Sequence, residues 1–165
     1  RASLLMIKFR IVDNINTVVQ VSILAKNIWN EHYSPIIGNE QVSYMLKKFQ
    51  SQDAIQQQID RGYRYYIILD NQVEVGYFSL QYRSDKLFLS KLYILKSSRG
   101  KGIGKQGIQF IKSAFSNPII QLTVNKNNAR SIAFYRNVGF KIVDDVVIDI
   151  GGGFVMDDYV MEMEN

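Results

Sequence analysis

Three glycines stand between an apolar run and a helix-like stretch, where the residue types could bind an anion. Positions 100, 102 and 104 are glycine, and residues 87–95 before them are typical of a strand. Bare backbone lets N–H groups converge on one ligand, and a helix that begins there adds the positive end of its dipole. We therefore expect a phosphate-bearing cofactor at this turn, with a ligand-free glycine turn as the alternative. Full positive charges surround the turn at Arg99, Lys101 and Lys105.

Two common phosphate motifs do not fit this turn. A nucleotide P-loop needs Ser or Thr directly after Gly-Lys, and here glutamine follows Lys105. The dinucleotide fingerprint G-x-G-x-x-G does begin at Gly102, but it requires an acidic residue near the end of the next strand to hold a ribose. That strand ends near residue 125 without a carboxylate. The remaining pattern is Arg-x-x-Gly-x-Gly, formed by Arg99, Gly102 and Gly104.

A second group of residues follows the next strand, in residues 124–140. Asn127 or Asn128 can cap a helix start, and apolar residues recur at helical spacing up to Val138. Gly139 then stands where a helix end favours a left-handed residue. The phenol of Tyr135 on this helix could serve as an acid, although Tyr135 considered alone would be interpreted as a core residue.

Together the two groups resemble the signatures of the GNAT N-acetyltransferase family. The first signature is the Arg-x-x-Gly-x-Gly loop, and the second consists of Asn128, Phe134-Tyr135 and Gly139-Phe140 in the family's register. The resemblance covers nearly the whole chain. It implies the α/β (α+β) acyl-CoA N-acyltransferase fold, with a mixed central sheet of about seven strands flanked by helices. Less specific similarity to spermidine/spermine N-acetyltransferase-like members lies around Trp29, Tyr33 and residues 149–159.

The resemblance also implies acetyl-CoA as cofactor and a role for individual residues. The pantetheine arm would pair with the strand backbone, the loop backbone would bind the pyrophosphate, and Asn128 and Ser131 would face the cofactor arm. The N–H of Ile94 would stabilise the oxyanion, and Tyr135 would protonate the leaving thiolate, so these two are the expected catalytic residues. The full expected cofactor-binding set is Leu92, Tyr93, Ile94, Arg99, Gly100, Lys101, Gly102, Ile103, Gly104, Lys105, Asn128, Ser131 and Tyr135.

The elements read along the chain follow the order β-α-α-β-β-β-α-β-α-β-β. We expect a strand at residues 6–12, a helix at 15–30 with Val18, Ile23 and Trp29 inward, a loop at 31–38, and helices at 40–49 (capped by Asn39) and 52–61. A three-stranded meander should occupy residues 63–95, followed by a helix at 104–115. Residues 119–124 should form a buried, wholly apolar parallel strand. After the helix of the second signature, residues 140–150 and 154–163 should form a hairpin.

Composition limits the classes of protein that the chain could be. With 165 residues, we expect one N-acetyltransferase domain over residues 1–165, with residues 1–5 preceding a native start at Met6. The absence of cysteine and the single histidine, His32, exclude disulfides and predict no metal site. The formal net charge of +5 is compatible with anionic ligands, and the chain lacks an apolar stretch that could span a bilayer. We therefore expect a cytoplasmic protein without a membrane or nucleic-acid partner, and a homodimer stays open.

We expect the acetyl group to pass directly to a primary amine of a small molecule, which could be a polyamine. Protein N-terminal or lysine acetylation and a non-catalytic acyl-CoA-binding module remain alternatives; a nucleic-acid-binding protein and a nicotinamide enzyme are further ones. No base is assigned, because residues 87–92 contain no carboxylate. Residues 31–38 and 150–158 should form the pocket rim, where Asp157 and Asp158 could contact a cationic substrate. Substitute bases would be side chains that we expect to be solvated surface charges: Glu31, Glu40, Glu74 and Asp158.

Overall fold

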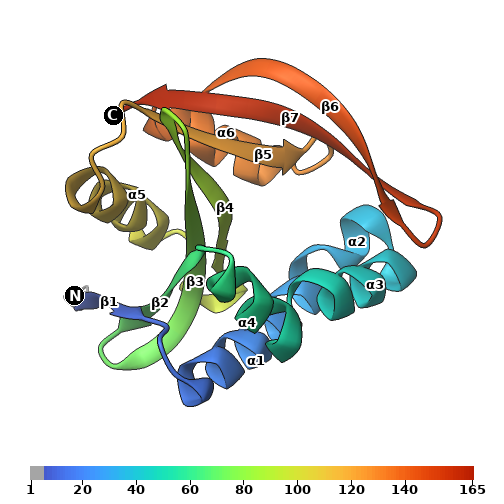
Figure 1. Ribbon diagram of the computed structural model, residues 1–165, viewed down its shortest axis with the longest axis horizontal. Helices are drawn as coiled ribbons and strands as arrows, with labels where there is room; N and C mark the ends of the chain where they lie inside the picture. Colours follow the sequence, from blue (N-terminus) through green and yellow to red (C-terminus); the bar gives the residue numbers. More distant parts are fainter. Residues whose placement is uncertain (1–5) are drawn as a thin grey trace.

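A computed structural model describes residues 6–165 and contains one mixed sheet of seven strands (Figure 1). The strand order within these residues is β1-β2-β3-β4-β5-β7-β6, and every neighbouring pair is antiparallel except β4 and β5. This arrangement confirms the predicted fold class, while the expectation about residues 1–5 falls outside the described residues. The strands are β1 (Ile7–Ile11), β2 (Arg64–Asp70), β3 (Val73–Arg83), β4 (Lys86–Ile94), β5 (Ile119–Asn125), β6 (Lys141–Gly151) and β7 (Phe154–Glu164).

The helices cover both faces of the sheet. Four of them lie between β1 and β2, and two lie in the second half of the chain (Figure 1). In the part of the chain that the structure describes, no helix combines the length and apolar character needed to cross a membrane. The helices are α1 (Ile15–His32), α2 (Ser34–Ile37), α3 (Asn39–Phe49), α4 (Gln52–Asp60), α5 (Ile103–Ala114) and α6 (Ala129–Val138), with a short 3-10 helix η1 (Lys96–Ser98).

Local sequence determines where α1 begins and which side of it is buried. The side chain of Asn14 accepts a hydrogen bond from the N–H of Thr17, and the hydroxyl of Thr17 accepts one from the N–H of Asn14, which is a reciprocal capping box. Val18 and Trp29 are buried as predicted. Ile23 was placed on the same face wrongly: its side chain is 57% exposed, because at 100° per residue it lies away from that stripe.

The predicted loop at residues 31–38 is largely helical, which corrects that prediction. Helix α1 continues to His32, and Ser34–Ile37 forms α2 with Pro35 in its first turn, where the missing N–H of proline costs no helical hydrogen bond. Gly38, with φ +86°, is the N-cap of α3. Asn39, which was predicted to be the cap, is therefore the first residue of the helix. Four helices therefore lie between β1 and β2: the three that were predicted by residue range and α2 in the predicted loop, so the element order, which contains two helices there, was wrong.

Alternation along the central strands builds a core on each face of the sheet. Tyr65, Ile67 and Leu69 of β2 pack in the cluster that contains the buried residues of α1, α3 and α4. Ile68 points to the other face and packs in the cluster that contains Ile108 of α5 and residues of α6. The predicted inner face of α5, namely Ile108, Ile111 and Phe115, is buried there.

Strand β5 differs from the fully apolar strand that was predicted. It is parallel only to β4, and β7 pairs with it along its whole length in antiparallel fashion. Ile120, Leu122 and Val124 are buried, whereas Gln121 and Thr123 alternate with them and point to the other face. Thr123 is thereby available to line a cavity beside the sheet.

The predicted hairpin of β6 and β7 reaches across to α3. Its turn contains three glycines with positive φ, at residues 151–153. The hydroxyl of Tyr44 on α3 donates to the carbonyl oxygen of Ile150 at 2.8 Å, and the side chain of Gln41 donates to the carbonyl oxygen of Val155 at 3.1 Å. These contacts hold the hairpin over the first half of the chain, which Figure 1 shows at its right-hand end.

Candidate active site

Strands β4 and β5 separate after a short paired segment, and this split is the centre of the site. Only three residue pairs join them, from Lys86 with Ile119 to Phe88 with Gln121, although β4 continues to Ile94 and β5 to Asn125. Figure 1 shows the two strands diverging from a common end. Beyond Phe88, the edge of β4 that faces β5 therefore lacks a strand partner and offers backbone groups to a ligand.

The orientation of the backbone in β4 can be followed from its pairing with β3. The N–H of Leu95 donates to the carbonyl oxygen of Val75 at 2.8 Å, so Leu95 points toward β3. Because consecutive residues of an antiparallel strand point their backbone groups to opposite edges, the N–H of Ile94 points into the split. The carbonyl oxygen of Ile94 accepts a hydrogen bond from Nε of Arg99 at 3.1 Å on that side.

An irregularity in β4 helps to bend it away from β5. Lys91 pairs with Ser79 and Leu89 pairs with Leu80, so Ser90 is an extra residue opposite β3. Such a bulge increases local twist and bends its strand. Ser90 faces a cavity at the split.

The glycine loop forms the end of the split nearest α5. Gly100 and Gly102 have φ of +77° and +79°, a region that side-chain-bearing residues rarely adopt, and open space surrounds the Cβ positions of both. Gly102 precedes α5, whose first-turn N–H groups have no acceptor within the helix. Arg99, Lys105 and Arg130 lie around this helix terminus. The donors and cations thus fit a diphosphate.

A cavity of about 390 Å³ extends from the glycine loop along β4 to α6. It brings together every predicted cofactor-binding residue except Lys101, which is exposed, and Asn128. Some of the residues that line this cavity were not predicted from the sequence. Arg130 could have been predicted, because it lies within the second signature. The lining residues that were not predicted include His32, Tyr33, Ser98, Arg130, Phe134 and Asn137.

Helix α6 forms where the sequence predicted a helix, and Tyr135 on it lines this cavity. The Asn128 side chain accepts from the N–H of Ser131 at 3.2 Å and caps the helix, and Gly139 ends it with φ +115°. Asn128 is buried and its amide nitrogen donates to the hydroxyl of Tyr33 at 3.3 Å, so its polar atoms have partners within the protein. Its contact with a cofactor stays a prediction.

The close approach of α5 to α6 depends on a glycine. A Cβ at Gly104 would lie 2.9 Å from the ring of Phe134, which lines the large cavity. The Phe134 ring in turn packs edge-on against Tyr135, with ring centroids 5.3 Å apart. This stack fixes where the phenol of Tyr135 enters the site.

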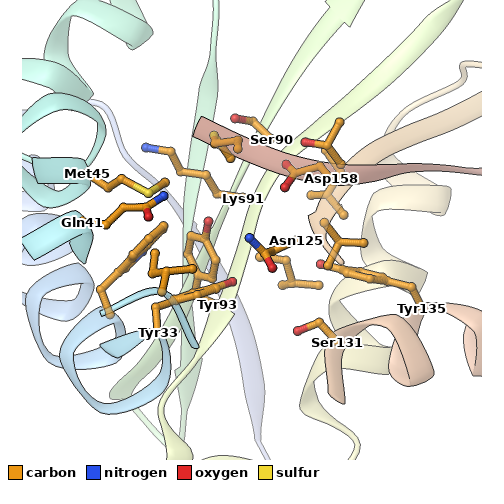
Figure 2. A pocket seen from close by; sticks show the side chains of 17 residues that line it. Tyr33, Gln41, Met45, Ser90, Lys91, Tyr93, Asn125, Ser131, Tyr135 and Asp158 are labelled. Carbon is orange, nitrogen blue, oxygen red and sulfur yellow. The ribbon is translucent and has the colours of Figure 1, made fainter. Parts of the chain in front are cut away.

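A second cavity, of about 90 Å³, lies on the other side of Tyr135 and is drawn in Figure 2. Tyr135, Ser131, Tyr33 and the end of β4 line both cavities, so the two spaces meet there. Burial raises the pKa of Tyr135, so the phenol stays protonated at neutral pH. The remaining walls of the second cavity include Trp29, Gln41, Met45, Ser90, Lys91, Thr123, Asn125 and Asp158.

The family comparison matches most of the chain. A sequence model described as "Acetyltransferase (GNAT) domain" matches residues 33–162. This chain belongs to the GNAT acetyltransferase family. Members of the family use acetyl-CoA as the acetyl donor, and coenzyme A carries a diphosphate. The search of curated protein sequences found no significant match.

Solved structures have the same fold as this GNAT chain at low sequence identity. A PaiA N-acetyltransferase of Thermoplasma acidophilum in complex with coenzyme A is 21% identical over 97% of this chain and 99% of that one, with a TM-score of 0.78. A GCN5-related N-acetyltransferase of Rhodopseudomonas palustris is 12% identical over 100% of both chains, with a TM-score of 0.79. The ribosomal-protein-S18-alanine N-acetyltransferase of Escherichia coli is 12% identical over 96% and 94%, with a TM-score of 0.70. At these identities the likeness shows the fold alone.

Of the four acids predicted to be solvated surface charges, Glu31 and Glu40 are exposed and Glu74 is half-buried, whereas Asp158 departs from the prediction. Glu31 accepts a hydrogen bond from the backbone N–H of Lys96 at 2.7 Å, and Asp157 pairs with Lys126 at 3.0 Å. Asp158 is 1% exposed, which corrects its placement on the surface. Residue alternation along β7 explains the contrast, because neighbouring residues point to opposite faces of the sheet.

Lys91 is a further buried ionisable group beside the second cavity. It is 6% exposed, and its amine donates to the carbonyl oxygen of Phe49 and the hydroxyl of Tyr65. Burial lowers the pKa of Lys91 well below its usual value, since no carboxylate pairs with it among the described residues. Sequence reasoning did not single out Lys91, because one lysine in an apolar strand resembles an edge position.

Proposed function

We propose that this GNAT chain transfers the acetyl group of acetyl-CoA directly to the primary amine of a small molecule. The observation that carries the proposal is the meeting of two different cavities at Tyr135 and the end of β4. The larger has cations and a helix N-terminus that suit a diphosphate. The smaller has aromatic walls and a buried carboxyl that suit an amine. A donor and an acceptor held in these cavities would meet at their shared wall.

Different residues of the larger cavity would bind different parts of the acetyl donor. The backbone of residues 100–105, with Arg99, suits the pyrophosphate, and the unpaired edge of β4 at residues 92–94 suits an amide-rich arm. The bound donor supplies an activated acetyl thioester. The N–H of Ile94 points into the split, where it would stabilise the negative charge that develops on the acetyl oxygen.

Tyr135 would give a proton to the departing sulfur. Its hydroxyl lies on the wall that the two cavities share, and burial keeps it protonated. The proton transfer moves the negative charge from the departing sulfur to the Tyr135 oxygen, which is neutralised when the acetylated nitrogen gives up its excess proton. The absence of cysteine is consistent with direct transfer to the amine.

A small amine suits the second cavity better than a folded protein does. The hairpin of β6 and β7 is tied to α3 above it, and the cavity measures about 90 Å³. Polyamines are candidates within this class, since the carboxyl of Asp158 and the rings of Trp29, Tyr33 and Tyr93 favour a cation.

A panel of acceptors tests the proposal. Free thiol release from acetyl-CoA would be followed with polyamines, simple aliphatic amines, peptides with a free N-terminus and peptides with an internal lysine. We expect turnover with an aliphatic amine or polyamine and none above background with peptides. Turnover with peptides alone would favour a protein acetyltransferase. Calorimetric binding of acetyl-CoA without turnover of any acceptor would favour a non-catalytic acyl-CoA-binding module.

A further inference from the structure

The reaction proposed above needs a proton acceptor, because an amine is protonated at neutral pH and attacks only as the free base. Strand β4 supplies no carboxylate at residues 87–92. The structure separates the four acids that the sequence offered as candidate bases. Glu31 already accepts from the N–H of Lys96, and neither Glu40 nor Glu74 lines a cavity. Asp158 is the remaining candidate.

Asp158 is built into the wall of the second cavity. It lies on β7, opposite Asn125 of β5 and Val146 of β6, and is 1% exposed. Its Oδ1 atom is buried and has no hydrogen-bond partner. Figure 2 shows Asp158 reaching from β7 into the space between Lys91 and Tyr135. A buried carboxyl oxygen without a partner, beside a cavity that Tyr135 also lines, is arranged to receive a donor from a ligand.

No cation within the described residues neutralises Asp158. Lys126 is the nearby cation, but it forms its ion pairs with Asp145 at 2.9 Å and with Asp157 at 3.0 Å. Burial and then the charge of Asp157 raise the pKa of Asp158 to about 6, against smaller opposing effects of Thr123 and Lys126. The negative charge of Asp158 helps to raise the pKa of Tyr33. The other ionisable groups near Asp158 line the same cavity and are Lys91, Tyr93 and Tyr135.

We infer that Asp158 binds the ammonium group of the acceptor and takes its proton before the nitrogen attacks the acetyl carbon. This inference rests on the proposed function and adds to it a catalytic residue and a substrate class. The acceptor is an aliphatic primary amine that enters as a cation, and its charge is the partner that the buried carboxylate lacks. The aromatic rings of Trp29, Tyr33 and Tyr93 line the same cavity and suit the cation as it arrives.

The protons balance as follows. The ammonium gives its first proton to Asp158, and the nitrogen lone pair then forms the N–C bond while the acetyl C=O electrons move to oxygen, against the N–H of Ile94. When the C–S bond breaks, the departing sulfur takes the proton of Tyr135. The nitrogen, now an amide, gives up its second excess proton to the Tyr135 oxygen. One proton is released overall, from Asp158 to solvent.

The pH profile of the wild-type enzyme gives the first test. With an aliphatic amine whose own pKa lies well above 9, kcat/KM should fall below about pH 6, because protonated Asp158 can neither pair with the ammonium nor accept its proton. It should fall again above the pKa of the amine, where the cation is lost. A profile flat from pH 5 to 8 would overturn the inference without any variant.

Asp158→Asn gives the second test, with Asp85→Asn as its matched control in the exposed turn between β3 and β4, outside both cavities. We expect D158N to lower kcat/KM for the amine by roughly 100-fold or more and to remove the acidic limb, since general-base catalysis contributes about 10²–10⁴-fold. D85N should stay within a few-fold of wild type. Asp158→Glu keeps a carboxylate and should recover part of the activity with its acidic limb, so it tests the inference even if D158N folds poorly.

A binding measurement separates acceptor recognition from turnover. The amine would be titrated calorimetrically onto protein saturated with coenzyme A, where no transfer can occur. Wild type and D85N should bind it at pH 7.5, and D158N should bind it at least 10-fold more weakly. Equal binding and equal kcat/KM in wild type and D158N would overturn the role of Asp158 while leaving the proposed function intact. A wild-type protein that binds acetyl-CoA but acetylates no amine would overturn both.

Discussion

Gly76 on β3 lies against Tyr93 on β4 so closely that a Cβ atom at Gly76 would be 2.4 Å from the carbonyl oxygen of Tyr93. Real Cβ atoms do not approach backbone oxygens to that distance, so a side chain there must push β4 away. Gly76 also pairs directly with Ile94, whose N–H points into the split between β4 and β5. The contact between these strands therefore determines where the proposed oxyanion donor lies.

Gly76→Ala should destabilise the fold and slow the reaction together. Overpacking of this kind costs about 1–3 kcal/mol, which urea denaturation would measure, and the displaced Ile94 should lower kcat. Gly107→Ala is the matched control, because its Cβ would meet only Leu92, at 4.0 Å, in the interior of α5. That change should raise stability by up to about 1 kcal/mol. A stability of G76A equal to that of wild type would contradict the close approach of β3 to β4 at this position.

Gly102→Glu should abolish measurable binding of acetyl-CoA. The residue has φ +79° and its Cβ position is open, so a side chain there is strained in the backbone and carries a negative charge to the proposed diphosphate site. Calorimetry with coenzyme A would measure the loss. Gln109→Glu adds the same charge to an exposed position of α5 and should bind normally. Unchanged affinity in G102E would place the diphosphate elsewhere.

Tyr135→Phe should lower kcat by roughly 10²-fold or more while leaving the affinity for coenzyme A within about threefold, because only the proton donor is removed. Since burial raises the pKa of Tyr135, its ionisation should not limit the wild-type rate below pH 9. Tyr66→Phe removes a hydroxyl on β2 outside both cavities and serves as the control. The role of Tyr135 as the acid is wrong if Y135F turns over at the wild-type rate.

Lys91→Met should change how stability depends on pH. Burial lowers the pKa of Lys91 in the folded protein, so the unfolded chain binds more protons and wild-type stability should rise with pH between 7 and 9.5. One such group contributes at most about 1.4 kcal/mol per pH unit. In K91M that rise should be lost, as measured by urea denaturation at several pH values. Lys112→Met, at an exposed site on α5, should retain the wild-type slope.

The other groups with shifted pKa values set the pH range in which this effect of Lys91 can be measured. Asp158 has a raised pKa of about 6, so its effect on stability lies below pH 7. Burial raises the pKa values of Tyr33, Tyr65 and Tyr135, which therefore reduce stability only above pH 10. A parallel rise in K91M and wild type between pH 7 and 9.5 would mean that Lys91 is charged in the folded protein.

Several local features of this chain could be predicted from residue types alone. Glycines at 100 and 102 adopt the left-handed backbone that their residue type alone allows without strain, and Asn128 and Gly139 cap and end α6 as expected. The apolar spacing of Ile108 and Ile111 predicted the buried face of α5. These signals depend on neighbours within a few residues, so the sequence by itself determined the family resemblance, the conformation of the glycine loop and the position of Tyr135 on α6.

Only the tertiary structure decided the acceptor side of the site. Asp158 and Asp157 are adjacent acids with no local feature to separate them, yet one is buried beside Tyr135 and the other pairs with Lys126. Lys91 is likewise buried, and its amine contacts Phe49 of α3 and Tyr65 of β2, which are 42 and 26 positions away in the sequence. The burial of these side chains and their ion pairs depend on contacts between segments that are distant in the sequence. The spacing of residues along the sequence does not predict those contacts.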